Sequence, residues 1–131
     1  MADQLKLTWD TNYEPVPVLQ LHGRLDADGA QQLQDAALAS LRGGESVNLV
    51  VDLEGVEFVA STGLATFLLL VEIFNESQGI VVFVKAAPAV MQVISLLNID
   101  QFLKLENSTE AAVQLIGAEA DSENLETRTA L

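Results

Sequence analysis

Two adjacent hydroxyl residues, Ser61 and Thr62, stand where an apolar, strand-like segment gives way to a helical pattern. A hydroxyl at the start of a helix can cap a free backbone N–H group, and Gly63 directly after the pair allows another backbone to approach closely. Either hydroxyl can also be phosphorylated, which adds about −1.5 to −2 charge at neutral pH. The dipole of a helix that starts here would favour this charge by roughly 0.3–1 kcal/mol. The position therefore suits a phosphorylation site whose modification leaves the domain folded, and a simple helix cap is the alternative interpretation.

Other chemistry finds little support among the residues. A hydrolytic triad needs a histidine beside a hydroxyl and a carboxylate, but His22 is the only histidine and no Gly-x-Ser-x-Gly turn is present. Asp52, Glu54 and Glu57 match no calcium loop in their spacing, and we interpret them as acids on the solvated rim of a loop. Because no glycine-rich phosphate loop with its lysine occurs either, we expect no enzymatic activity, no cofactor and no metal site.

The composition bounds the class of protein. With 131 residues, of which 50% are hydrophobic, the chain can form one compact domain with a substantial core. Its 19 acidic residues against 6 basic ones give a net charge of −13, which repels nucleic acids and anionic membranes. The absence of cysteine excludes disulfides and thiolate zinc sites. No uncharged apolar run reaches the ~20 residues of a membrane span and no signal peptide is recognisable, so we expect a cytoplasmic protein without membrane insertion.

Short apolar runs mark the expected strands. Runs rich in β-branched residues predict buried strands over Val16–Leu21, Val47–Leu53 and Ile80–Val84. Leu5–Trp9 alternates with a period of two and predicts an edge strand that forms a hairpin with the first of them. Phe102–Leu105 predicts a short last strand. Near-continuous apolar character in the central runs is typical of a sheet that helices cover.

Apolar residues at helical spacing predict four helices between and after these strands. The helices are expected over Ala27–Leu41, over Thr62–Gln78, from Pro88 and, as a short helix, from Asn107. This order predicts an α/β domain with a mixed, mostly parallel sheet of about five strands, an antiparallel edge hairpin and four helices. We assign residues 1–116 to this domain and expect the acidic residues 117–131 to form a flexible tail.

The helix expected over Thr62–Gln78 is apolar beyond the stripe that a surface helix buries. Its inward positions are expected to be Leu64, Phe67, Leu68, Val71 and Phe74. Ala65, Leu69, Leu70 and Ile73 fall on its flanks and outer side, where charged residues are usual. Such a helix is either covered within its own domain or docks on another protein. In the helix from Pro88, the inward positions are expected to be Val90, Val93, Ile94 and Leu97.

Three segments resemble a known family. The chain from Asp52 reads Asp-Leu-Glu-Gly-Val-Glu-Phe-Val-Ala-Ser-Thr-Gly-Leu, which resembles the signature of STAS domains, the family of bacterial anti-sigma factor antagonists and sulfate-transporter tails. Gly23-Arg-Leu-Asp26 resembles the family's Gly-x-Leu-Asp, and Pro88-Ala-Val through Phe102 resembles its third helix and the exit from that helix. The resemblance covers about residues 5–116, with the three blocks in the family's order. It implies the STAS fold.

The resemblance also implies a function. In the family, the residue before the Gly of Asp-Ser-Ser-Gly-Leu is phosphorylated by a partner anti-sigma factor kinase, and only the unphosphorylated form holds that partner. Thr62 occupies this position, Ser61 is the preceding hydroxyl, and Ala60 replaces the family's Asp. The implied protein is a non-enzymatic anti-sigma factor antagonist that binds an anti-sigma factor serine/threonine kinase and is switched off by phosphorylation at Thr62, with Ser61 as second choice. The expected partner-binding residues are Asp26, Glu57, Ala60, Ser61, Thr62, Gly63, Leu64, Leu69 and Ile73.

Two further points stay open at the level of the sequence. A cognate phosphatase is a second candidate partner, and the resemblance leaves room for a homo-oligomer. The alternative function is a constitutive scaffold or an accessory STAS subunit, stressosome-like or transporter-associated, in which Thr62 contacts the partner without being modified. The replacement of the family's Asp by Ala60 is the feature that supports this alternative.

Overall fold

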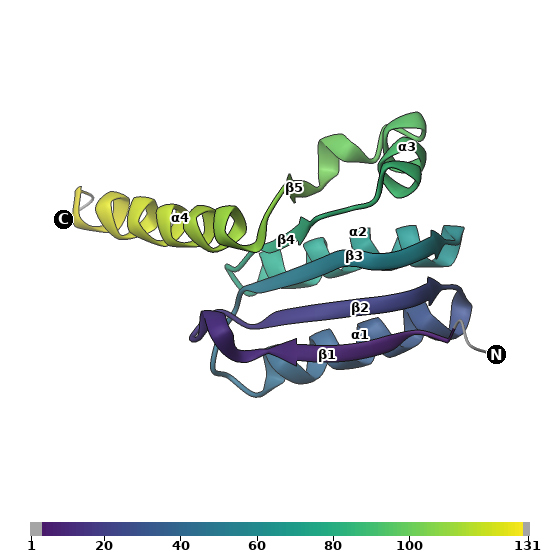
Figure 1. Cartoon of the computed structure of the whole chain (residues 1–131). Helices are drawn as coiled ribbons and strands as arrows, with labels where there is room; N and C mark the ends of the chain where they lie inside the picture. The colour runs from purple at the N-terminus through teal and green to yellow at the C-terminus, as the bar shows by residue number, and fades with distance from the viewer. Residues whose placement is uncertain (1–3, 130–131) are drawn as a thin grey trace.

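A five-stranded sheet with helices on both faces forms the body of the protein (Figure 1). The computed structural model describes residues 4–129, with side chains up to Glu119. In chain order the elements are β1 (Lys6–Asp10), the 3-10 turn η1 (Thr11–Tyr13), β2 (Val18–Leu25), α1 (Ala27–Arg42), β3 (Leu49–Val59), α2 (Ser61–Glu76), β4 (Val81–Val84), α3 (Pro88–Leu96), the 3-10 turn η2 (Asp100–Phe102), β5 (Lys104–Glu106) and α4 (Thr109–Thr129). Within the described residues, no helix combines the length and the apolar character that crossing a membrane requires.

The strands follow one another in the sheet in the order β1-β2-β3-β4-β5. β1 runs antiparallel to β2, and all other neighbours are parallel, so the predicted fold class is confirmed. Leu19 of β2 pairs with Trp9 of β1 on one side and with Val51 of β3 on the other. Between β2 and β3 the register shifts twice, so the alternation of side chains is interrupted near the carboxyl ends of both strands.

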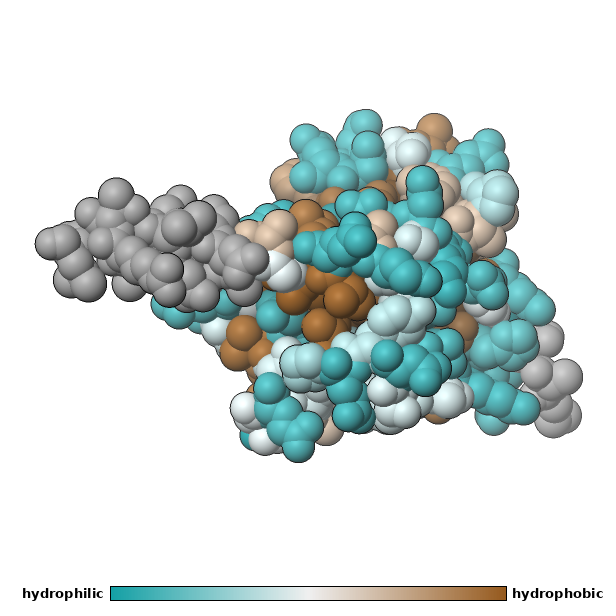
Figure 2. All heavy atoms as spheres, turned by 60° about the vertical axis from the view of Figure 1, so that its left-hand side comes forward, coloured by the Kyte–Doolittle hydropathy of each residue, from teal (hydrophilic) through white to brown (hydrophobic). Residues whose placement is uncertain are grey.

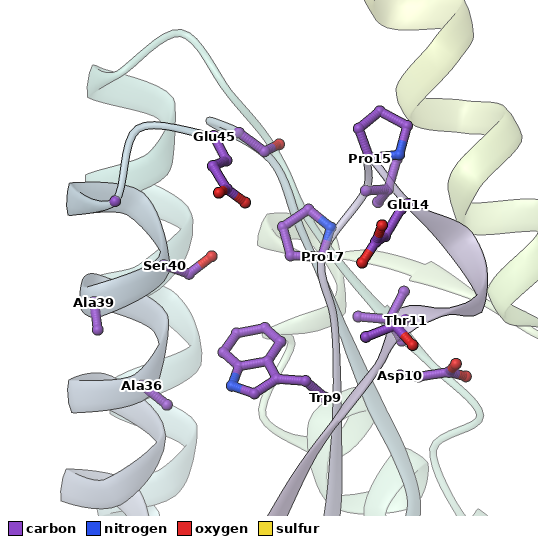
Figure 3. A pocket seen from close by; sticks show the side chains of 14 residues that line it. Trp9, Asp10, Thr11, Glu14, Pro15, Pro17, Ala36, Ala39, Ser40 and Glu45 are labelled. Carbon is purple, nitrogen blue, oxygen red and sulfur yellow. The ribbon is translucent and has the colours of Figure 1, made fainter.

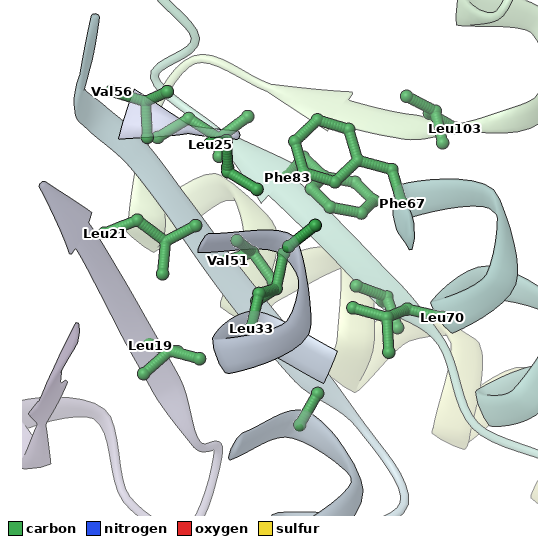
Figure 4. Close-up of a cluster of buried hydrophobic side chains, with 14 of the residues drawn as sticks. Leu19, Leu21, Leu25, Leu33, Val51, Val56, Phe67, Leu70, Phe83 and Leu103 are labelled. Atoms are coloured by element: carbon green, nitrogen blue, oxygen red, sulfur yellow. The ribbon is translucent and has the colours of Figure 1, made fainter. Parts of the chain in front are cut away.

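Two apolar clusters hold the layers together. The larger one lies between the sheet and the helices α1, α2 and α3, and Figure 4 shows side chains from β2, β3 and β4 meeting those of α1 and α2. At its centre the rings of Phe67 and Phe83 lie 4.6 Å apart and tilted, an arrangement that aromatic pairs favour. The smaller cluster joins the other face of β2, β3 and β4 to Ala112 and Ile116 of α4. The central strands are therefore buried on both faces, which explains their near-continuous apolar character.

The buried sides of α2 and α3 differ from those expected. Leu70 is fully buried, although its position predicts the outer side of α2, while Leu68 and Val71 are only half-buried. The reason is that α1 packs alongside α2, so the side of α2 that faces α1 is buried as well. Val93 of α3 and Leu97 directly after it are exposed rather than inward-facing. α3 lies near β5 at one end of the sheet in Figure 1, and its main contacts are with β3.

The last helix is longer than predicted. α4 begins after Ser108, whose Oγ accepts a hydrogen bond from the Ala111 N–H at 3.0 Å, and it continues to Thr129. The expectation of a short helix is wrong because the acidic segment is also rich in alanine, glutamate and leucine, which favour helix over coil. Lys104 and Glu119 pair at 3.5 Å and tie this helix to β5. The flexibility of residues 117–131 stays a prediction, and residues 130–131 lie outside the described part of the chain.

Candidate functional site

The carboxyl ends of β2 and β3 bring the predicted site residues together. Leu25 and Val59 pair in the last register position of the two parallel strands, and the Ala60 N–H donates to the Leu25 carbonyl at 2.9 Å. α1 follows directly after Asp26 and α2 directly after Ala60. The two helices therefore start side by side at one edge of the sheet. Segments that are more than thirty positions apart in the sequence form one surface here.

The two helix starts are capped differently. The Asp26 carboxylate accepts a hydrogen bond from the Gly29 N–H at 2.9 Å and so caps α1. Ala60 holds the equivalent position in α2 and offers no side-chain acceptor. Ser61 and Thr62 are the first two helical residues rather than the cap, so the expectation that one of their hydroxyls caps α2 is wrong. Both side chains are exposed, and the structure gives them no hydrogen bond to another described side chain or to the backbone.

Gly63 and Leu64 position the start of α2. A Cβ atom at Gly63 would lie 2.9 Å from Val59 Cγ1 and 3.0 Å from the Leu25 carbonyl oxygen, so the close backbone approach expected of this glycine is confirmed. Leu64 is only 4% exposed and belongs to the larger core cluster. Its side chain anchors the first turn of α2 in the core, and a direct contact of Leu64 with a partner stays a prediction.

The outer side of α2 continues the exposed surface away from Thr62. Ala65 is exposed, Leu69 is 36% exposed and Ile73 is half-buried. These residues follow Thr62 at spacings of three, seven and eleven, which places them on one helical stripe. Glu57 is exposed on β3 just before the site. The structure thus groups Asp26, Ala60, Ser61 and Thr62 at one edge and extends from there along α2.

Asp52, the first acidic residue of the segment before the site, has a structural role. Asp52 lies within β3 and is only 5% exposed, so the interpretation of this residue as a solvated loop acid is wrong. Its carboxylate accepts hydrogen bonds from the Glu54 N–H at 2.9 Å and from Lys85 Nζ at 3.3 Å. Burial lowers the pKa of Lys85, but the charge and hydrogen bond of Asp52, with Glu54 and Glu110 adding, leave that pKa raised. In the described residues, no group of three potential ligands could hold a metal ion.

The sequence did not indicate one pair beside the site. The Arg24 guanidinium lies 4.3 Å from the ring centroid of Phe58, which is itself exposed. Both residues precede the site by two positions, Arg24 before Asp26 and Phe58 before Ala60. They become partners because the register shifts between Gly23 and Arg24. Periodicity alone cannot reveal such a pair, since a bulge changes which face a side chain occupies.

His22 has no catalytic setting. It lies exposed on β2, and its ring fills the space that a side chain at Gly55 would need. The structure gives it no hydrogen bond to a described hydroxyl or carboxylate, so it does not form the hydrogen-bonded chain of a triad.

Comparison with known proteins assigns this fold and surface to a family. The family model described as "Mlab, STAS domain" matches residues 12–106. BtrV of Bordetella bronchiseptica, which is assigned to the anti-sigma factor antagonists, is 29% identical over 108 residues, covering 82% of this chain and 91% of that protein. The chain belongs to the STAS domain family.

Solved structures share the fold of this chain. The crystal structure of an anti-sigma factor antagonist from Mycobacterium paratuberculosis has a TM-score of 0.76 at 26% identity and covers 88% of this chain and 97% of that one. The anti-sigma factor antagonist SpoIIAA in its unphosphorylated form shares the fold, with a TM-score of 0.71 at 17% identity over 86% of this chain and 97% of that one. The chain is therefore a STAS domain protein related to the non-enzymatic anti-sigma factor antagonists.

Proposed function

We propose that this protein is a cytoplasmic anti-sigma factor antagonist, that it binds an anti-sigma factor serine/threonine kinase at the start of α2, and that phosphorylation of Thr62 releases this partner. The observation that carries the proposal is the setting of Thr62. Its side chain is exposed in the first turn of α2 and uncommitted to any described hydrogen bond. A kinase can therefore reach the hydroxyl without unfolding the domain.

The uncapped start of α2 explains why the domain would stay folded when Thr62 is phosphorylated. No side chain accepts from the first N–H groups of α2, so a phosphate on Thr62 would add negative charge where the helix dipole favours it, by roughly 0.3–1 kcal/mol. SpoIIAA of Bacillus, which shares the fold at a TM-score of 0.64, has a structure in the phosphorylated form. The effect of phosphate then falls on the partner rather than on the body of the domain.

Charge around Thr62 explains the release. Asp26 and Glu57 are exposed beside the site, so a partner surface that docks here already faces two carboxylates. A dianion on Thr62 adds to this negative field and to the bulk at the contact. Poorly matched charge at an interface costs several kcal/mol, and each 1.4 kcal/mol weakens binding about tenfold. A complex of micromolar affinity would dissociate under such a change.

Exposed apolar side chains supply the docking surface. The α2–α3 face, as we name it, comprises the exposed large apolar residues of α2, α3 and η2, which are Leu69, Val93, Leu96, Leu97 and Phe102. Elsewhere in the described chain only Trp9, Val47 and Phe58 are large, apolar and exposed. Leu96 is 77% exposed, which is unusual for a leucine that serves only its own domain. The number of exposed large apolar residues on these elements supports partner binding there.

The proposal is tested by mass spectrometry and by capture. Protein purified from its own cells should carry phosphate on Thr62, with Ser61 as the second site to inspect. In affinity capture from the same cells, wild type and Thr62→Ala should retain the kinase, whereas Thr62→Asp should lose it. Thr8→Asp is the matched control, because it adds one charge at an exposed position of β1 away from the site. If Thr62→Asp and Thr8→Asp capture the kinase equally, the switch is refuted.

A constitutive scaffold or accessory subunit is the second candidate function. Ala60 favours it, because a carboxylate that flanks the hydroxyl in the family is missing here. The same experiment separates the two: a constitutive subunit would show no phosphate on Thr62, and its partner would be retained by the Thr62→Asp variant. We give priority to the switch because the Thr62 side chain is exposed in the first turn of α2.

A further inference from the structure

A groove of about 950 Å³ lies at the end of the molecule opposite to Thr62. Its lining comes from the end of β1, the turn into β2, the C-terminal half of α1 and the loop after α1 (Figure 3). These segments lie where β2 and β3 begin, whereas Thr62 follows the end of β3. A ligand in this groove would therefore leave the start of α2 free, and its binding is independent of the proposed switch.

Small side chains on α1 create the groove. Ala36, Ala39 and Ser40 follow each other at helical spacing on the side of α1 that lines the groove, and Gly43 directly after the helix continues this stripe. Trp9 projects from β1 toward this stripe and stays 43% exposed (Figure 3). Larger residues on α1 would fill the space over the indole. The helix instead leaves open a broad aromatic face, which attracts apolar groups and cations.

The groove carries negative charge without a cation of its own. Glu14, from the turn before β2, and Glu45, from the loop after α1, are both exposed and lie beside the groove in Figure 3. Neither takes part in an ion pair among the described residues. Asp10 also lines the groove, but its carboxylate accepts hydrogen bonds from the Asn12 N–H at 3.0 Å and from Gln20 Nε2 at 3.4 Å. None of the lining residues is basic.

Figure 2 turns the left-hand side of Figure 1, where β2 and β3 begin, toward the viewer. Hydrophobic and hydrophilic side chains lie next to each other on this side of the molecule. The lining of the groove is itself mixed, with Trp9, Val16 and Pro17 beside Glu14 and Glu45. A mixture of apolar and polar groups is usual in a protein–protein contact. The chemistry of the lining then decides which partner fits.

We propose that this groove, which we name the Trp9 groove, binds a segment of a partner protein that carries an arginine or lysine beside apolar residues. The aliphatic stem of such a residue would lie on the apolar lining, with its cation over the Trp9 indole and near Glu14 and Glu45. Charge complementarity selects this occupant. A second copy of the chain, with a net charge of −13, would instead bring more negative charge to the two glutamates.

Trp9 is the only tryptophan, so its fluorescence reports on the groove directly. The full chain is titrated with the acetylated, amidated peptide Ala-Leu-Arg-Leu-Ala and with the same peptide carrying citrulline, a neutral isostere, in place of arginine. We expect a saturable change in Trp9 emission with the arginine peptide. The citrulline peptide should bind about fivefold more weakly, or worse. The double variant Glu14→Gln/Glu45→Gln should lose affinity for the arginine peptide by a similar factor.

The control variant is Glu72→Gln/Asp100→Asn, which removes the same charge from two exposed positions outside the groove. It should bind the arginine peptide as the wild type does, and thermal unfolding should show both double variants folded. Equal binding of the two peptides, no saturable change, or equal loss in both double variants overturns the proposal. So does tetramethylammonium binding as tightly as the arginine peptide, which would indicate a small-cation site. Emission that depends on protein concentration without peptide would indicate self-association and also overturns it.

Discussion

The missing cap of α2 offers a direct test of how the site is built. Asp26 caps α1 with backbone angles of φ −87° and ψ −168°, and Ala60 precedes α2 with φ −79° and ψ 168°. The backbone at Ala60 is thus already in the extended conformation that a cap residue adopts. Replacing Ala60 with Asp should add the capping hydrogen bond without moving the chain. The Ala60 N–H keeps its bond to the Leu25 carbonyl.

The expected gain in stability follows from the usual energy of a helix cap. Losing a side-chain cap costs about 0.5–2 kcal/mol, so gaining one at Ala60 should raise the free energy of unfolding by about 1 kcal/mol. For a domain of this size that corresponds to a rise in melting temperature of about 4 °C. The carboxylate also gains from the helix dipole but is repelled by Asp26 and Glu57. Ala60→Asn supplies the cap without the charge and separates these terms.

Urea unfolding followed by Trp9 emission and by far-ultraviolet circular dichroism measures the change. Ala60→Asp and Ala60→Asn should both move the midpoint to higher urea at unchanged slope, and Asp26→Ala should lower it by a similar amount. If Asn stabilises and Asp does not, repulsion from the neighbouring acids outweighs the dipole. If neither variant shifts the midpoint while Asp26→Ala does, the start of α2 gains nothing from a cap and our account of the site is refuted.

Three further predictions concern other parts of the fold. Gly63→Ala should lower the free energy of unfolding by about 1–3 kcal/mol, because its Cβ would lie 2.9 Å from Val59 Cγ1. Gly117→Ala is the control: a Cβ there meets no neighbouring atom within 4 Å, so the change should be neutral or stabilising. Urea unfolding measures both variants, and equal effects would contradict the close packing at Gly63. The raised pKa of Lys85 means that its ion pair stabilises the fold fully below the unfolded pKa of about 10.4 and loses this contribution as pH rises through the folded pKa. The fall in the urea midpoint from about pH 8 to about pH 11.5 should therefore be smaller in Lys85→Met than in the wild type, and an equal fall would refute the pairing. Leu96→Ser should weaken capture of the kinase while leaving the melting temperature within about 2 °C, since the side chain is exposed; unchanged capture would remove α3 from the docking surface.

Local patterns were sufficient to predict much of this fold. Val81–Val84 and Ala27–Arg42 lie within one residue of the predicted strand and helix, because the apolar runs there are short, regular and bounded by glycine or a capping acid. β3 extends to Val59, beyond the predicted end at Leu53. The polar positions of that extension read as loop, but pairing with β2 satisfies their backbone groups and holds them in the sheet.

Residue patterns alone predicted the class of fold, the family and the position of the hydroxyl pair at the start of a helix, because periodicity and the Asp-Leu-Glu-Gly-Val block are local properties of the chain. The exposure of the hydroxyl and apolar side chains depends instead on how the folded elements pack. Leu70 is buried and Leu96 exposed because α1 covers one helix and nothing in the described chain covers the outer side of the other. The Trp9 groove has the same origin, since it depends on which residues of α1 face β1. Such facts depend on packing between distant segments, and no window of sequence contains them.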